Sequence, residues 1–204
     1  MTRLVALDPD AHCDDLWQAF GGARTPDMWE FMPIGPFEDK EAFHQGLKWI
    51  ALHSDWVPYA ILGRNTGRAF GTASFMRIDR TNGVAEVGCI AYGEGLRRQP
   101  AGTEAMLLMG RRIFEELGYR RYEWKCDARN LPSRRAAERL GFTFEGIFRQ
   151  HMVVKNRNRD TAWFAILDRD WARISASMQR WLDPFNFDEE GQQKSGLRQF
   201  AKAS

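Results

Sequence analysis

The sequence contains few of the residues from which disulfide-bonded or metal-bound cores are built. Among its 204 residues are three cysteines and four histidines. Cys13, Cys89 and Cys126 are widely spaced and odd in number, which gives neither a disulfide framework nor a paired-cysteine zinc site. The histidines show no metal-ligand spacing either. We therefore expect three reduced thiols and no metal.

A strong net charge and long hydrophobic runs are also missing. The 29 basic and 27 acidic residues give a formal net charge of +2, which indicates neither nucleic acid nor an anionic membrane as a partner. No apolar run approaches the roughly 20 residues of a membrane span, and the N-terminal apolar stretch is too short for a signal peptide. A cytoplasmic location is the expectation. Walker and G-x-S-x-G sequences are absent, so nucleotide-triphosphatase and hydrolase functions lack support.

The apolar content that is present suits one substantial core. Hydrophobic residues make up 44% of the chain, and the length is that of about one domain. We expect a single domain over residues 1–182 and a polar C-terminal extension over residues 183–204. The extension is expected to be partly mobile, because polar residues dominate it from Asp188 onward.

The order of the apolar segments predicts an α/β (α+β) fold. Apolar stretches bounded by turn residues predict strands at residues 3–7, 57–62, 69–78, 84–91, 121–126, 144–154 and 161–167. Helical spacing predicts helices at residues 14–20, 38–52, 132–140 and 171–182, and a further helix that starts near residue 100 and stops at Gly118. A turn at residues 155–160 is expected to join the last two strands. Together these segments predict a mixed, mostly antiparallel central sheet of about seven strands flanked by helices.

The segment from Arg97 to Ala105, with the sequence RRQPAGTEA, is the most informative part of the chain. A tight turn of small residues leaves backbone N–H groups free where a helix begins, and the helix dipole adds partial positive charge there. Apolar residues then recur at helical spacing, at Ala105, Met109, Ile113 and Leu117. The segment therefore predicts a pyrophosphate cradle at the start of a real helix.

A second block follows about thirty residues later. It reads Asn130-Leu131-Pro132-Ser133 and continues through Leu140-Gly141-Phe142 to Glu145-Gly146. Together the two blocks resemble the GNAT superfamily of N-acetyltransferases, and within it the RimJ/RimL branch of ribosomal-protein N-terminal acetyltransferases. The resemblance covers roughly residues 57–167. It implies the GNAT acyltransferase fold, with acetyl-CoA (coenzyme A) as the acetyl donor.

The resemblance also implies how the cofactor is held. The residues implied are Gly88, Cys89, Ile90, Arg97, Arg98, Ala101, Gly102, Thr103, Asn130 and Ser133. In the family the pyrophosphate lies in the cradle, the Asn side chain bonds the pantetheine arm, and the Ser lies near its sulfur end. Pro100 departs from the family pattern, because it stands where a glycine is expected and cannot donate an N–H, although proline suits the first turn of a helix.

Glu86 is the candidate general base. Strand alternation places it on one face with Gly88 and Ile90, and puts Val87 and Cys89 on the other. In many relatives a glutamate on this strand accepts the amine proton, directly or through water. The alternative is a strand-end carboxylate that is solvated or paired with an arginine.

The remaining proton-transfer groups of the superfamily are replaced in this chain. The usual acid, a tyrosine four residues before the glycine of the Gly-Phe pair, is Ala137 here, so Ser133 becomes the candidate acid. A thiol leaving group with a pKa near about 8.5 needs little help. The relatives' basic glutamate, ten residues after Phe142, is Met152. Base catalysis therefore falls to Glu86 or to a water.

The acceptor is expected to be a primary amine. At pH 7 about 10% of an α-amine is neutral, against well under about 0.1% of a lysine side chain, so modest base machinery favours a protein N-terminus. A small-molecule amine is a second hypothesis, and a non-catalytic CoA-binding sensor or assembly module of the same fold is a third. The candidate walls of an acceptor pocket are the Trp29–Phe37 loop, Trp49, Trp56, Phe75 and Trp124.

A few side chains have two open interpretations. Arg77, Arg80 and Arg149 could contact an acceptor carboxylate or a cofactor phosphate, although most such arginines are solvated surface residues. His151 is near the expected cleft, with a packing or surface role preferred. The hairpin and the aromatic C-terminal segment, with Trp171, Trp181 and Phe185, suggest a homodimer.

Overall fold

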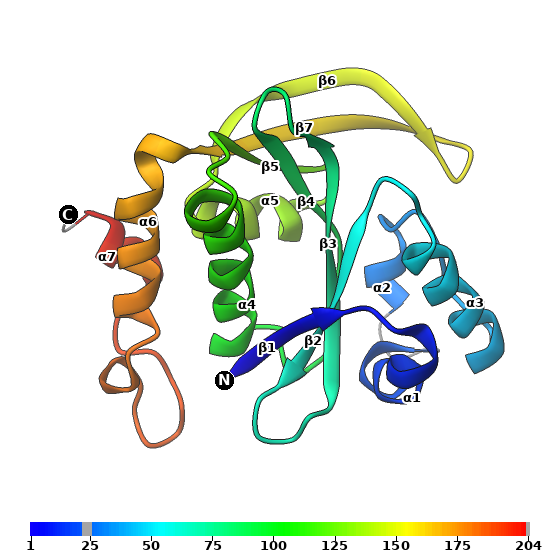
Figure 1. Ribbon diagram of the computed structural model, residues 1–204, viewed down its shortest axis with the longest axis horizontal. Coiled ribbons are helices and arrows are strands. Elements are labelled where there is room, and N and C mark those ends of the chain that lie inside the picture. The colour runs from blue at the N-terminus through cyan, green and yellow to red at the C-terminus, as the bar shows by residue number, and fades with distance from the viewer. Residues whose placement is uncertain (22–25, 203–204) are drawn as a thin grey trace.

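The computed structural model describes residues 1–21 and 26–202 and contains one seven-stranded sheet (Figure 1). The strands are β1 (Thr2–Ala6), β2 (Val57–Gly63), β3 (Ala69–Asp79), β4 (Val84–Tyr92), β5 (Arg121–Asp127), β6 (Thr143–Val154) and β7 (Arg157–Leu167), in the order β1-β2-β3-β4-β5-β7-β6. Only the β4–β5 pair is parallel; the other five neighbouring pairs are antiparallel. The predicted mixed, mostly antiparallel sheet of seven strands is therefore confirmed.

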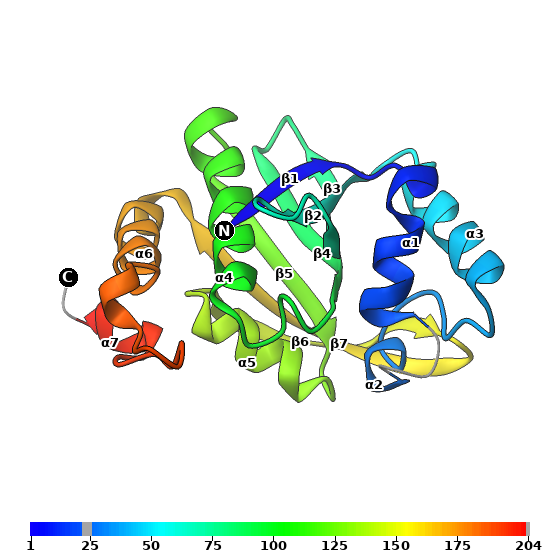
Figure 2. The same cartoon turned by 90° about the horizontal axis from the view of Figure 1, so that it is seen from below.

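Helices cover both faces of this sheet (Figures 1 and 2). On one side lie α1 (Pro9–Phe20), α2 (Pro26–Trp29) and α3 (Lys40–Ala51), and we call this the α1–α3 face. On the other lie α4 (Pro100–Arg111), extended by a π-helical turn at Arg112–Glu116, α5 (Leu131–Arg139) and α6 (Asp168–Trp181); we call this the α4–α5 face. A short 3₁₀ turn at Pro184–Asn186 and α7 (Leu197–Lys202) complete the chain's described part.

The helices begin where the sequence supplies a cap. Asp8 accepts hydrogen bonds from the N–H groups of Asp10 and Ala11 at the start of α1, and Asp39 accepts one from Ala42 at the start of α3. Such side chains satisfy N–H groups that have no partner within a helix. In both helices the buried side chains recur at helical spacing, which fixes the side that faces the sheet.

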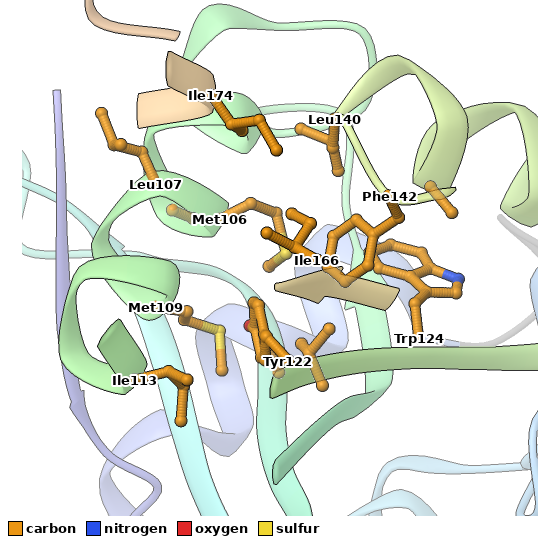
Figure 3. Packing of buried hydrophobic residues seen from close by; sticks show 14 of the residues in the cluster. Met106, Leu107, Met109, Ile113, Tyr122, Trp124, Leu140, Phe142, Ile166 and Ile174 are labelled. Atoms are coloured by element: carbon orange, nitrogen blue, oxygen red, sulfur yellow. The ribbon is translucent and has the colours of Figure 1, made fainter. Parts of the chain in front are cut away.

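Two apolar cores result, one on each face of the sheet. The larger core lies between the sheet and α4, α5 and α6, and Figure 3 shows Met106 and Met109 of α4 directed toward Tyr122 of β5. Phe142 packs against Trp124 in the same core, with ring centroids 5.5 Å apart. The smaller core holds the buried sides of α1 and α3 against the other face. The sheet is thus fixed from both sides, apart from the long β6–β7 hairpin.

The β6–β7 hairpin is longer than the sequence predicts. The expected turn at residues 155–160 is confined to Lys155 and Asn156, whose φ angles are 49° and 59°, and β7 already begins at Arg157. Two successive positive φ angles are typical of a two-residue type I′ hairpin turn. The polar run Arg157–Asp160 resembles a turn in sequence, but this arm of the hairpin is mostly exposed and its side chains can be polar.

Strand alternation in β4 breaks at Cys89, contrary to the prediction. Cys89 has a φ of 48°, and the pairing with β3 shifts by one residue there, so it is a β-bulge. As a result Cys89 packs with the α1–α3 core, on the same side as Glu86, while Ile90 packs with the α4–α5 core. The bulge exchanges the faces that the sequence assigned to these two residues.

The C-terminal segment packs on α6, whereas the sequence predicts a partly mobile extension. Leu197 is buried in the larger core, and the buried Asn186 side chain donates to the carbonyl oxygens of Trp181 and Ser195 over 3.0 and 3.1 Å. Trp171 and Trp181 are buried as well, so neither is available for the subunit contact that the sequence suggested. The division of the chain at residue 182 remains a prediction.

Candidate active site

The parallel strands β4 and β5 separate in the middle of the sheet. Their pairing covers only residues 84–87 of β4 and 121–124 of β5, although β4 continues to Tyr92 and β5 to Asp127. From Gly88 onward the edge of β4 that faces β5 therefore has backbone groups outside the sheet's pairing. An extended ligand with amide groups can bind such an edge as an added strand does.

The predicted pyrophosphate cradle lies just beyond the end of β4. α4 begins at Pro100, and Gln99 occupies its N-cap position without a side-chain cap bond. Within this first turn the Gly102 N–H donates to the carbonyl oxygen of Gln99 over 3.1 Å, whereas the Ala101 N–H remains for an anion. Gly102 is required by close packing, because a Cβ there would lie 2.5 Å from the carbonyl oxygen of Leu96. The next residue, Thr103, is buried. Its Oγ1 accepts a 2.9 Å hydrogen bond from Arg139.

A second helix begins beside the end of β5. Asn130 is the N-cap of α5, and its Oδ1 accepts a hydrogen bond from the N–H of Ser133 over 3.1 Å. The Oγ of Ser133 in turn accepts from Nε1 of Trp124 over 3.0 Å. Trp124 is opposite Val87 in the last paired rung between β4 and β5. Ser133 is therefore placed beside the point where the two strands separate, on the α4–α5 face.

Glu86 lies one rung earlier, on the α1–α3 face, and belongs to a group of charges whose central members are buried. Its Oε2 is 2.8 Å from Arg77 and 3.0 Å from Nζ of Lys125, while Lys125 also lies 2.7 Å from Glu123. Arg121 pairs with the other oxygen of Glu123 at 2.6 Å. Only 4% of the Glu86 side chain and 6% of the Lys125 side chain are exposed. We call these five residues the charge network.

The network fixes the orientation of the Glu86 carboxylate. Both of its ion pairs end on Oε2, whereas Oε1 lies 3.4 Å from the place that a Cβ on Gly88 would occupy. Gly88 is the first residue of β4 beyond the pairing with β5. Oε1 is thus directed to the beginning of the strand separation.

A cleft of about 290 Å³ opens further along the α1–α3 face. One wall comes from the segment after α2, and the other comes from the end of β5 and the β6–β7 hairpin. Lys155, at the hairpin tip, donates through Nζ to the carbonyl oxygens of Trp29 (2.7 Å), Ile34 (3.2 Å) and Gly35. Figure 2 shows the hairpin tip beside α2. This contact joins the two walls.

The aromatic residues proposed for an acceptor pocket separate into two groups. Trp29, Phe31 and Pro36 line the cleft. Phe75 and Trp124 instead belong to the larger core on the other face, so that assignment was wrong. Trp49 and Trp56 form a separate cluster with His53, with Trp56 stacked on His53 at 4.3 Å.

The two thiols nearest to the strand separation are protonated at neutral pH. Burial raises the pKa of Cys89 to about 12. Burial also raises the pKa of Cys126, although a hydrogen bond with Ser133 acts in the opposite direction. Because the thiolate is the nucleophile, neither thiol suits a covalent acetyl-cysteine intermediate.

In the sequence analysis we overlooked several residues that lie near Glu86. Lys125 was not a candidate, and Arg77 was considered for an acceptor carboxylate but pairs with Glu86. His151 bonds Thr161 through Nδ1 over 2.9 Å and lies 6.0 Å from the Trp163 ring. Arg159 lines the cleft. A charged residue at an inward position of a strand, such as Lys125 between Trp124 and Cys126, was the signal that could have revealed the network.

Metal-ligand clusters of three or more His, Cys, Asp or Glu side chains do not occur within residues 1–21 and 26–202. In the same part of the chain no helix is long and apolar enough to cross a bilayer.

Comparison with known proteins identifies the class to which this fold and site belong. The sequence profile of the acetyltransferase (GNAT) domain matches residues 3–143. The chain is 30% identical to "Uncharacterized N-acetyltransferase p20" of Bacillus licheniformis over 152 residues, which cover 72% of this chain and 84% of that protein. This protein therefore belongs to the GNAT acetyltransferase family, whose members use acetyl-CoA as cosubstrate.

Two solved structures are similar over most of the chain. A GCN5-related N-acetyltransferase from Brucella melitensis is 44% identical, with a TM-score of 0.95 over 98% of this chain and 91% of that one. A probable GNAT-family acetyltransferase from Chromobacterium violaceum is 41% identical, with a TM-score of 0.78 over 84% and 85% of the two chains. Both agree with the GNAT fold of the seven-stranded sheet.

Proposed function

We propose that this N-acetyltransferase moves the acetyl group of acetyl-CoA to a primary amine by direct attack in a ternary complex, with a protein N-terminal α-amine as the leading acceptor. The observation that carries the proposal is the separation of β4 from β5 at Gly88, between two helix N-termini on one face and the Glu86 carboxylate on the other. Donor and acceptor can then approach the same point from opposite faces of the sheet.

The residues proposed to hold the cofactor lie along one path on the α4–α5 face. Backbone groups at Gly88–Ile90 offer a strand edge to the pantetheine amides. The start of α4 offers the Ala101 N–H and the positive end of the helix dipole to the pyrophosphate, with Gly102 and Thr103 in the same turn and Arg97 and Arg98 exposed beside it. The Thr103 side chain is engaged with Arg139, so only its backbone is available. When bound, acetyl-CoA supplies a thioester carbonyl as the electrophile.

Glu86 and Ser133 are proposed as the proton-transfer groups. Oε1 of Glu86 would accept a proton from the attacking amine, directly or through water, while Arg77 and Lys125 hold Oε2 in place. The Ser133 Oγ accepts a bond from Trp124, and its hydrogen, which also bonds Cys126, would turn from that thiol to the departing thiolate. Direct transfer is favoured because the two thiols nearest to the strand separation stay protonated.

Calorimetric titration with acetyl-CoA, followed by thiol release in the presence of a panel of amines, tests the proposal. We expect Glu86→Gln to keep acetyl-CoA affinity and to lower kcat by about 100-fold or more, as the loss of a general base does. The exposed Glu189→Gln is the matched control and should change neither quantity. Acetyl-CoA binding without transfer to any amine would instead favour the non-catalytic sensor or assembly module.

Further assignments remain proposals of the same kind. The T-E-A sequence after the cradle and the N-x-x-S block support membership of the RimJ/RimL branch. A cytoplasmic location follows from the expected protein substrate. A homodimer is proposed through β6, an edge strand whose Ile147, Phe148 and Val153 side chains are exposed; a monomer in solution would contradict it.

A further inference from the structure

Arg159 lies on the α1–α3 face of β7, in line with the charge network. Thr161 and Trp163 follow it at alternate positions, and Trp163 is opposite Lys125 in the register of β5 and β7. Nζ of Lys125 lies 3.9 Å from the centre of the Trp163 ring, and Glu86 is the next residue in this row. Arg159 also lines the cleft, so it stands between the cleft and the proposed base.

The guanidinium of Arg159 has an unsatisfied donor. Its Nε is inaccessible to solvent and has no hydrogen-bond partner within the described part of the chain. The Arg159 side chain also forms no ion pair with the described residues. Burial lowers the pKa of Arg159, while nearby Glu86 acts to raise it. A buried N–H without an acceptor is costly, and Arg159 as a whole is half-buried without an ion pair.

Two other cations that line the cleft, Arg129 and Lys155, do have partners, and Arg157 is exposed to solvent at the hairpin. Arg129 forms two hydrogen bonds with Asp127, at 3.1 Å and 2.9 Å, and Lys155 is bound by three backbone carbonyl oxygens. Glu86 is likewise engaged by Arg77 and Lys125. The nearby carboxylates that could have neutralised Arg159 are thus committed elsewhere, apart from Glu30 on the facing wall of the cleft.

Two further observations favour an anion at this place. Nε1 of Trp29, another residue lining the cleft, is buried and has no partner among the described residues. The electrostatic environment of His151 is positive. Burial lowers the pKa of His151, and the positive charges of Arg159, Arg77 and Lys125 lower it further. Glu86 raises it by a smaller amount. Orphaned donors in a positive field suit a group that is negatively charged and rich in hydrogen-bond acceptors.

We infer that Arg159 makes the enzyme selective for acceptor amines that carry an anionic group, a carboxylate or a phosphate, bound in the cleft while the amine reaches Glu86. This inference rests on the proposed function and narrows its substrate class. It concerns the acceptor alone, since the proposed cofactor path lies on the opposite face of the sheet.

Matched pairs of amines test the inference. One pair is a tripeptide amide with aspartate as its second residue and its asparagine counterpart, and the other is O-phosphoethanolamine and ethanolamine. We expect at least one anionic member to have a kcat/KM 10-fold or more above that of its neutral partner. Arg159→Gln should bring this ratio close to one without changing the affinity for acetyl-CoA. Arg149→Gln, which removes an exposed arginine of β6 outside the cleft, should keep the ratio.

The outcomes separate the inference from the proposed function. A preference in the peptide pair alone would identify a carboxylate, and a preference in the phosphoethanolamine pair alone would identify a phosphate. Equal rates within both pairs, or a ratio that survives Arg159→Gln, would overturn the inference while acetyl transfer stands. Weaker acetyl-CoA binding in Arg159→Gln would also overturn it, because Arg159 would then serve the cofactor. Failure to acetylate any amine would defeat the proposed function and the inference together.

Discussion

The two faces of the sheet around the β4–β5 separation are built by different means. On the α4–α5 face two helix N-termini, at Pro100 and Leu131, meet an apolar core. On the α1–α3 face, the charge network and a cleft lie beside the smaller apolar core. The first face is a product of local sequence, since a turn and a helix start contain all the required groups. The second requires residues from strands far apart in the chain.

Removal of Lys125 is the largest perturbation of the α1–α3 face that we predict. In Lys125→Met, Glu86 retains only Arg77 and Glu123 retains only Arg121, so two buried carboxylates lose a partner. We expect the free energy of unfolding to fall by about 3 kcal/mol, as for broken buried ion pairs. Urea denaturation would measure this.

Arg112→Met is the matched control for Lys125→Met, because it breaks an exposed i,i+4 pair with Glu116. It should cost no more than about 0.5 kcal/mol. Adding Glu123→Gln to Lys125→Met should restore part of the lost stability. Equal losses for the Lys125 and Arg112 variants would mean that the network behaves as a set of surface charges.

Gly102→Ala should perturb the α4–α5 face without affecting the network. The new Cβ would lie 2.5 Å from the Leu96 carbonyl oxygen and 3.0 Å from the Tyr92 ring, so the cradle must shift. We expect a loss of about 1 to 3 kcal/mol from overpacking, together with weaker acetyl-CoA binding in calorimetry. Gly196→Ala introduces the same methyl group where no atom lies within 4 Å, and should leave both quantities unchanged.

These contrasts also explain how much the sequence could reveal. The seven strands and the helix starts near residues 100 and 132 follow from short-range patterns, and the fold was predicted correctly, whereas the capping of α5 by Asn130 was not predicted. The bulge at Cys89 and the two-residue turn at Lys155 were not predicted, because strand pairing rather than local sequence determines them. The relation of Glu86, Lys125 and Arg159 depends on the register of three strands, which no local pattern specifies.

Asn130 has two roles on the α4–α5 face that a pair of substitutions can separate. Its Oδ1 caps α5, whereas the family resemblance gives the side chain a bond to the cofactor. Asn130→Ala removes both roles and should cost about 1 kcal/mol of stability together with acetyl-CoA affinity. Asn130→Asp keeps a capping oxygen but loses the amide donor, so it should keep the stability and still weaken acetyl-CoA binding. If Asn130→Asp leaves acetyl-CoA binding unchanged, then Asn130 only caps α5 and does not bind the cofactor.

The smallest predicted effect concerns Arg121, the member of the charge network that also binds Glu145 of β6 with two hydrogen bonds. These bonds hold the pKa of Glu145 below its usual value, with burial acting in the opposite direction. A lowered pKa in the folded state means that the contribution to stability is present above the unfolded pKa of about 4.3 and is lost as the pH falls through the folded value. Because 39% of the Glu145 side chain is exposed, the contribution should not exceed about 1 kcal/mol. Glu145→Gln should therefore be slightly less stable than the parent protein in urea at pH 7, and the difference should shrink as the pH falls below the unfolded pKa. A difference that persists at acid pH would show that Glu145 acts through packing of the hairpin rather than through its charge.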